Sequence, residues 1–170
     1  MGHDSSLTRL VLIAACLCAS PFQSFAAPTL PVLEADIAKK GGHYVIDHYF
    51  NCPDACDGVR LVETGNPSSV AFGVKMLKYS DAGSTDELQG ALAAALVKRP
   101  EIVLPYVNSG PGLEAEHICL PFLSADETKP KLRALVERTR KSLLRVTAGN
   151  LQRQKAACSK EVESSLAILH

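Results

Sequence analysis

The sequence predicts an all-α protein: a compact multi-helix bundle or a HEAT-like curl of seven to eight helices, held by two disulfides. Three observations predict this class. Helix start and stop signals recur along the chain after residue 26, apolar residues repeat at helical spacing, and the links between predicted helices are short. Short links favour antiparallel neighbours, as in helical bundles.

Residues 1–26 are predicted to be a signal peptide. An apolar run of about ten residues follows Arg9, which is too short to span a bilayer. Pro21 breaks this run, and Ser24-Phe25-Ala26 supplies the small residues that signal peptidase requires, so we expect cleavage after Ala26. The remaining residues 27–170 form a single helical domain.

Export predicts a periplasmic or secreted protein, with lipidation at Cys16 as an alternative that would anchor it. Disulfides persist in these compartments. The cysteines that remain after cleavage are Cys52, Cys56, Cys119 and Cys158. Four cysteines allow more than one connectivity. We expect Cys52–Cys56 because Cys52-Pro53 favours a helix N-cap at Cys52, from which its side chain can turn toward Cys56. Cys119–Cys158 is then the second pair.

Eight segments carry helical signals. They span residues 30–50, 53–64, 66–79, 84–99, 100–107, 113–122, 124–146 and 151 to near the C-terminus. The first is interrupted at Gly41-Gly42, which predicts a kink or two short helices, and a strand over residues 44–50 is the alternative. Gly65 closes the second segment, and Asn66-Pro67 caps and starts the third.

The segment 84–99 has the clearest signals. Ser84-Thr85-Asp86-Glu87 predicts a capping box, and Lys98 and Arg99 suit the negative end of the helix dipole. Pro100 ends this helix and starts the next. Gly90 and four alanines in the helix predict close approach by a neighbour.

The C-terminal segments follow a Gly- and Pro-containing loop at 108–112. The helix predicted over 113–122 carries Cys119. Ser124-Ala125-Asp126-Glu127 predicts a second capping box, and the apolar stripe of the following helix extends to Val146. Gly149-Asn150 separates it from the last helix, which carries Cys158.

The formal net charge of zero conceals a division along the chain. Residues 27–128 contain 14 acidic and 7 basic side chains (−7), whereas residues 129–160 contain ten basic side chains and one acidic (+9). These cations predict either a solvated face or an interaction surface for anionic lipid or an acidic protein, and the acidic portion could instead bind a basic partner. The candidate residues are Lys131, Arg133, Arg138, Arg140, Lys141 and Arg145. Nucleic acid is not an expected partner, because no aromatic residues interleave with the cations.

Candidate catalytic chemistry is sparse. His43, His48, Cys52 and Cys56 are close in sequence and could hold a metal or act in redox chemistry, but their spacing matches no zinc or Cys-x2-Cys motif. His117 and Cys119 would face apart on one helix. There is no nucleophile elbow and no glycine-rich phosphate loop. We therefore expect a protein without catalytic activity or cofactor, with the metal or redox protein as an alternative.

Several stretches resemble a loose set of small helical secreted proteins of Gram-negative bacteria. They are Ile37-Ala-Lys-Lys-Gly-Gly42, Gly65-Asn66-Pro67, Asp81-Ala82-Gly83, Leu88–Leu104 with Arg99-Pro100, and Cys119-Leu-Pro-Phe122. In size, leader, helicity and disulfides the chain also resembles periplasmic immunity proteins that neutralise type VI secretion amidase effectors. This second resemblance implies a protein that binds another protein, such as a secreted cell-wall hydrolase. A homodimer is a separate alternative. A module that binds anionic lipid through the basic helix 129–146 is the alternative.

Overall fold

The structure is a computed structural model that describes residues 27–51, 56–120 and 128–169. The predicted leader, its cleavage site and Cys16 lie outside these residues. The described part is all-helical, which confirms the predicted fold class. It contains nine α-helices and three short 3₁₀ turns, rather than the seven or eight helices predicted.

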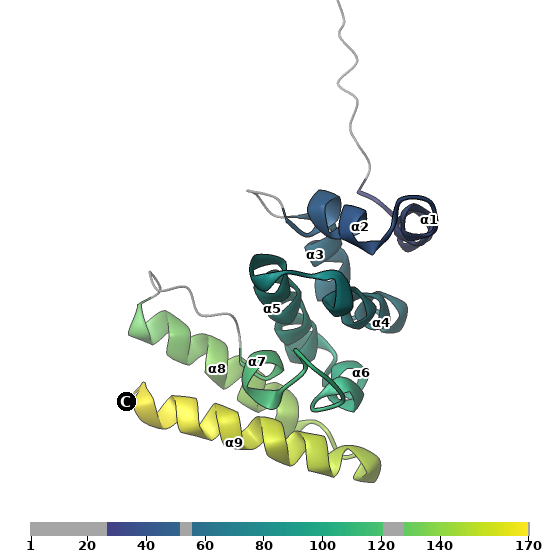
Figure 1. The fold of residues 1–170 in the computed structure, drawn as a ribbon. Helices are drawn as coiled ribbons and strands as arrows, with labels where there is room; N and C mark the ends of the chain where they lie inside the picture. The colour runs from purple at the N-terminus through teal and green to yellow at the C-terminus, as the bar shows by residue number, and fades with distance from the viewer. Residues whose placement is uncertain (1–26, 52–55, 121–127, 170) are drawn as a thin grey trace, which may run out of the picture.

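The helices follow one another from one end of the molecule to the other (Figure 1). Helices α1 and α2 lie at one end, α5 crosses the middle, and α8 and α9 form an antiparallel hairpin at the other end. The helices are α1 (Leu30–Lys40), α2 (Gly42–Tyr49), α3 (Asp57–Glu63), α4 (Pro67–Met76), α5 (Ala82–Lys98), α6 (Pro100–Val103), α7 (Ala115–Ile118), α8 (Lys129–Leu144) and α9 (Gln152–Ile168). The 3₁₀ turns are η1 (Leu77–Tyr79), η2 (Leu104–Tyr106) and η3 (Gly149–Leu151).

Helix α5 is the central element, in contact with α3, α4, α6, α7 and α8. Its buried face carries Leu88, Leu92 and Leu96, which are fully excluded from solvent. Burying a leucine side chain stabilises a fold by about 1.5–3 kcal/mol. Packing around α5 therefore accounts for a large part of the core.

The N-terminal helices pack closely through large apolar side chains and small residues. Phe50 and Val62 are fully buried. A Cβ atom on Gly58 would lie 2.5 Å from the carbonyl oxygen of Tyr49, and one on Gly73 would lie 2.8 Å from the side chain of Val62. These two glycines permit a helix spacing that a larger residue would prevent.

Polar bonds and a disulfide attach the α8–α9 hairpin to the rest of the fold, in addition to the apolar side chains of both helices that are buried in the core. The Ser142 hydroxyl lies 3.1 Å from the Leu96 carbonyl oxygen and 2.9 Å from that of Val97, and the Arg145 guanidinium donates to the Val97 carbonyl at 3.1 Å. These carbonyls belong to the last turn of α5, where no intrahelical donor reaches them. Residues from α8 therefore cap α5.

The Cys119–Cys158 disulfide is present, as predicted, with a Cα–Cα distance of 5.1 Å. It ties the end of α7 to the middle of α9. The other predicted pair includes Cys52, which lies outside the described residues; Cys56 is buried.

Two helix starts differ from the prediction. Helix α3 begins at Asp57 with Cys56 as its N-cap, and not at Pro53 with Cys52 as the cap, because Cys56 has extended backbone angles (φ −68°, ψ 137°) and its carbonyl accepts from the amide of Arg60 at 3.0 Å. Helix α5 begins at Ala82, because Asp81 and Ser84 form its capping box.

Two further segments are shorter than predicted. The helix expected over 113–122 is a single turn, Ala115–Ile118. The preceding loop is closed by Asn108, whose side chain accepts from the Ala115 amide at 3.0 Å, and this contact sets where the turn starts. Helix α8 begins at Lys129 with Thr128 as N-cap. The capping box predicted at 124–127 lies outside the described residues.

Most other boundaries agree with the prediction. Residues 30–50 form two helices separated at Gly41, which confirms the prediction of two short helices. The alternative prediction of a strand over residues 44–50 is wrong. Asn66 caps α4 by accepting from the Ser68 amide at 3.0 Å.

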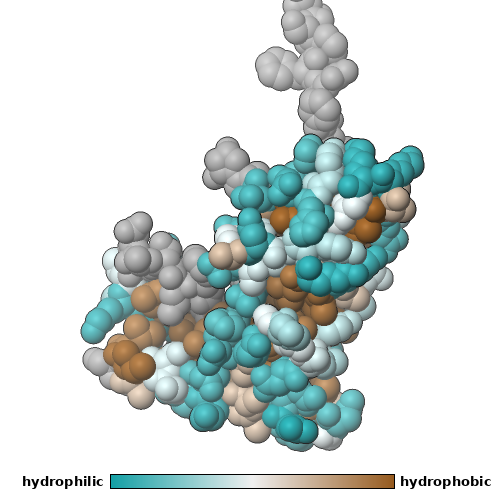
Figure 2. All heavy atoms as spheres, viewed as in Figure 1, coloured by the Kyte–Doolittle hydropathy of each residue, from teal (hydrophilic) through white to brown (hydrophobic). Residues whose placement is uncertain are grey.

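Figure 2 shows hydrophobic atoms in the middle of the face in view and at the end of the hairpin near the C-terminus. Ile168, at the end of α9, is 76% exposed.

Candidate functional site

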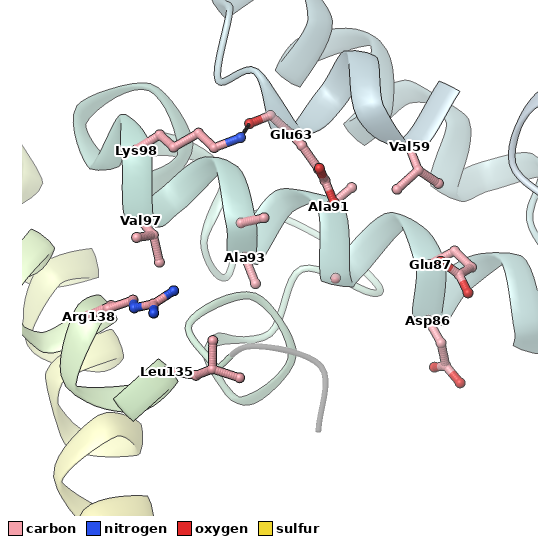
Figure 3. Close-up of a pocket in the computed structure, with 12 residues that line it drawn as sticks. Val59, Glu63, Asp86, Glu87, Ala91, Ala93, Val97, Lys98, Leu135 and Arg138 are labelled. Atoms are coloured by element: carbon pink, nitrogen blue, oxygen red, sulfur yellow. Dashed lines mark hydrogen bonds between the residues drawn. The ribbon is translucent and has the colours of Figure 1, made fainter. Parts of the chain in front are cut away.

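A groove of about 420 Å³ lies along α5, between α3 and α8 (Figure 3). Helix α5 forms its floor, α3 contributes Val59 and Glu63 to one side, and α8 contributes Leu135 and Arg138 to the other. The residues of α5 in the groove are Asp86, Glu87, Gly90, Ala91, Ala93, Ala94, Val97 and Lys98.

The floor of the groove is apolar and made of small side chains. At 100° per residue, Gly90, Ala94 and Val97 lie on the side of α5 opposite the buried Leu88 and Leu92. Gly90, Ala94 and Val97 are partly exposed. A surface helix ordinarily places polar residues on this side. The sequence predicts that a neighbouring helix lies close to these small residues. In the described part of the chain no helix covers this face, and it lines the groove.

The two ends of the groove carry opposite charges. Asp86 and Glu87 lie at one end, near the start of α5, and Lys98 and Arg138 lie at the other (Figure 3). The Lys98 ammonium donates to the backbone carbonyl of Glu63 at 2.7 Å, which joins the ends of α5 and α3.

The acidic end consists of side chains that are available to a ligand. Asp86 and Glu87 are exposed, and their carboxylates, like that of Glu63, make no hydrogen bond or ion pair with any described residue. The predicted capping box would have used Glu87 to cap α5. Because Asp81 and Ser84 take this role, with Ser84 N to Asp81 Oδ1 at 3.1 Å, Glu87 lies one turn further along the helix and faces the groove.

The predicted basic surface is divided among several directions. Arg140 faces α9, where its Nε donates to Glu163 at 2.8 Å and raises the pKa of the guanidinium. Arg145 caps α5 through Val97. Arg138 lines the groove. Lys141 is exposed.

The remaining two members of the predicted surface, Lys131 and Arg133, are exposed in the first turns of α8. The structure therefore places one of the six candidates, Arg138, at the groove and gives Arg140 and Arg145 contacts within the fold. The direction in which each of these side chains points depends on which helices lie beside α8. A count of charges along the chain does not predict it.

His43 and His48 do not share a site. The ring of His43 contacts Tyr79 edge-on at 5.7 Å between centroids, whereas the ring of His48 stacks on Tyr44 at 3.9 Å. Among the described residues there is no group of three or more histidine, cysteine, aspartate or glutamate side chains that could hold a metal. His117 is exposed beside Glu116, and Cys119 is in its disulfide, so these two do not form a Cys–His pair.

A polar network joins α1 to α2. Lys40 lies 3.1 Å from Asp36 and donates to the Tyr44 hydroxyl at 3.0 Å, and the Tyr49 hydroxyl donates to Asp36 at 2.9 Å. The hydrogen bond from Lys40, followed by that from Tyr49, lowers the pKa of the Asp36 carboxyl. Because every member is engaged with another, we interpret the network as a structural link between the two helices.

The sequence pattern does not predict the groove, although α5 contains a signal for it. An amphipathic surface helix has a polar outer face, but α5 has glycine and alanine there. The sequence pattern places Asp86 and Glu87 at the helix start and Leu135 in the apolar stripe of its own helix, and it gives Val59 and Glu63 no role. No spacing rule connects residues on three separate helices.

No family model matches the chain, and no curated protein and no solved structure shows significant similarity to it. None of the helices in residues 27–51, 56–120 and 128–169 has the length and hydropathy needed to cross a bilayer.

Proposed function

We propose that this chain is a non-catalytic periplasmic protein that binds another protein, and that it acts as an immunity protein against a secreted cell-wall hydrolase of the type VI amidase class. The observation that carries the proposal is the groove along α5. Its floor is apolar and its ends carry opposite charges, which suits a segment of another protein better than a small substrate.

The attachment of the α8–α9 hairpin supports the same interpretation. Leu135 and Arg138 of α8 form one side of the groove, and α8 is held against α5 by Ser142 and Arg145. The Cys119–Cys158 disulfide links α9, the other helix of the hairpin, to the end of α7. A binding surface that is rigid before binding loses less conformational entropy when a complex forms.

The test is direct complex formation and protection. The mature chain, residues 27–170, is mixed with secreted amidases encoded near its gene, and the mass of any complex is measured by native mass spectrometry. The proposal expects a stable complex, inhibited peptidoglycan hydrolysis, and sensitivity of a deletion strain to neighbouring cells that secrete the enzyme. It is wrong if no envelope hydrolase binds and the deletion strain is as resistant as the parent.

One observation favours a second candidate, the binding of anionic lipid. Leu144, at the end of α8, is 68% exposed and lies close to the exposed Lys141. An apolar side chain beside cations is typical of peripheral membrane contact. This candidate expects sedimentation with anionic liposomes that falls steeply with salt and is lost in Leu144→Ser with Lys141→Glu. Sedimentation that is absent or independent of salt would exclude it.

A further inference from the structure

The groove along α5 has a direction, because its charges are separated along the helix axis. Asp86 and Lys98, which lie at opposite ends, are 12 positions apart in α5, which corresponds to about 18 Å along a helix. This length accommodates about three turns of another helix.

The floor limits what can lie in the groove. Gly90 and Ala94 present almost no side chain, and small residues at a contact allow two helix axes to approach toward the lower end of the usual 8–10 Å range. Val59 and Leu135 stand on either side as apolar walls. An occupant with an apolar stripe about one helix wide would cover this surface.

The end charges set the orientation of such a helix. Helices are stabilised by acidic residues near their N-terminus and basic residues near their C-terminus, because of the helix dipole. A helix of this ordinary type that lies antiparallel to α5 places its basic end beside Asp86 and Glu87 and its acidic end beside Lys98 and Arg138. The parallel orientation would oppose like charges at both ends.

We propose that the groove binds one protruding amphipathic helix of the partner protein, antiparallel to α5, with basic residues at the C-terminal end of that helix and acidic residues at its N-terminal end. This inference rests on the proposed function and names the chemistry of the partner. The carboxylates of Asp86 and Glu87, which make no hydrogen bond or ion pair with any described residue, provide the attraction for the basic end.

A second copy of this chain is a poorer occupant. In an antiparallel arrangement, the α5 helix of a second copy would place opposite charges beside those of the first. That helix is also the floor of a groove, however, with α3 and α8 on its two sides. Two recessed floors do not come into contact when two copies face each other. The occupant must therefore supply a helix that stands out from its surface.

The experiment uses two synthetic, helix-constrained peptides of 14 residues with the same alanine and leucine stripe. One has glutamates at its N-terminal end and lysines at its C-terminal end; the other has these charges exchanged. Binding of each to residues 27–170 is measured by fluorescence anisotropy at low and high salt. We expect the first peptide to bind about tenfold more tightly at low salt, and the difference to narrow at high salt.

Substitutions in the groove test whether the peptides bind there. Asp86→Lys with Glu87→Lys changes exposed side chains and should abolish the preference between the peptides. Ala94→Trp should fill the groove and weaken the first peptide, whereas Ala71→Trp, at an exposed position on α4, is the matched control that should have no effect. Circular dichroism establishes that each variant is folded.

The inference is overturned if the peptides bind equally, if neither binds, or if Ala71→Trp has the same effect as Ala94→Trp. A dimer of the chain that Ala94→Trp converts to monomer, measured by light scattering, would also overturn it, because the second copy would then occupy the groove. These outcomes are separate from the test of the proposed function. An amidase complex that survives Ala94→Trp would leave the function standing and refute the groove as its site.

Discussion

The two ends of this molecule are held to its central helix by different means. Helices α3 and α4 pack on α5 through fully buried side chains such as Val62 and Val70. Gly58 allows α3 to lie close to the end of α2, and Gly73 allows α4 to lie close to α3. The α8–α9 hairpin also buries apolar side chains in the core, and it is joined further by the Cys119–Cys158 bond and by side-chain donors to the last carbonyls of α5. The first attachment is mainly apolar, whereas the second adds a few specific bonds to its apolar contacts.

This difference bears on the groove, because one of its walls comes from each end. Val59 and Glu63 belong to the densely packed part, whereas Leu135 and Arg138 belong to the hairpin. Loss of a bond that attaches the hairpin should therefore change the groove more readily than loss of one apolar contact at the other end. The following predictions test this comparison, from the largest expected effect to the smallest.

Removal of the hairpin's disulfide should have the largest effect. The two cysteines are 39 residues apart, and closing a loop of this size stabilises a fold by about 4 kcal/mol in the chain-entropy account. The double variant Cys119→Ala with Cys158→Ala should lose about this much free energy of unfolding, measured with urea. In reductant the wild type should approach the variant. If the difference in the free energy of unfolding between the wild type and the variant is unchanged by reductant, lost packing and not the disulfide bond is responsible.

A methyl group added at Gly58 should weaken the N-terminal end by about 2 kcal/mol, because overpacking a filled site forces its neighbours apart. The new atom would meet the Tyr49 carbonyl and the ring of Phe50. Gly83→Ala is a close control, since Gly83 is also the second residue of its helix and has open space around it. That variant should be as stable as the wild type or slightly more stable in the same urea titration.

Ser142→Ala should destabilise the protein by about 1 kcal/mol, which is typical of one buried hydrogen-bonding group. Arg145 still donates to Val97 in this variant, so the cap of α5 is only partly lost. Ser164→Ala, at an exposed position on α9, is the control. Amide hydrogen exchange should increase in the last turn of α5 in the first variant alone. Equal exchange in both would mean that Ser142 does not attach the hairpin.

The smallest effect concerns the start of α5 and depends on pH. Hydrogen bonds from the Ser84 hydroxyl and then its backbone amide hold the pKa of Asp81 below its ordinary value of 3.8. A lowered pKa in the folded state adds stability that is present above pH 3.8 and is lost as the pH falls through the folded value. Asp81→Asn keeps a good cap but cannot titrate. The stability of the wild type relative to this variant should therefore decrease in acid, and a constant difference would contradict the prediction.

How far the sequence predicts the fold can be judged from particular elements. Asn66-Pro67 and Pro100 act within one helix turn, and their predicted helix starts are confirmed. Asp81 and Ser84 compete with Ser84 and Glu87 for the same helix start, and the side chains of Ser80 and Thr85, 2.6 Å apart, accompany the earlier one. A choice between two adjacent capping boxes depends on such neighbours, and the local pattern alone does not make it.

The sequence by itself determined the helical class and several helix starts, because caps, prolines and apolar spacing act over a few residues. It offered the pairing of Cys119 with Cys158 as one of several connectivities, and the structure confirmed this pair. Only the tertiary structure decided that Asp86 and Glu87 face a groove, that Arg138 joins them there, and that Arg140 and Arg145 are used within the fold. The groove combines Val59 with Arg138, which are far apart in the chain. Where such side chains meet depends on how helices pack and rotate against each other, and this is settled by the burial of the whole core and not by any local pattern.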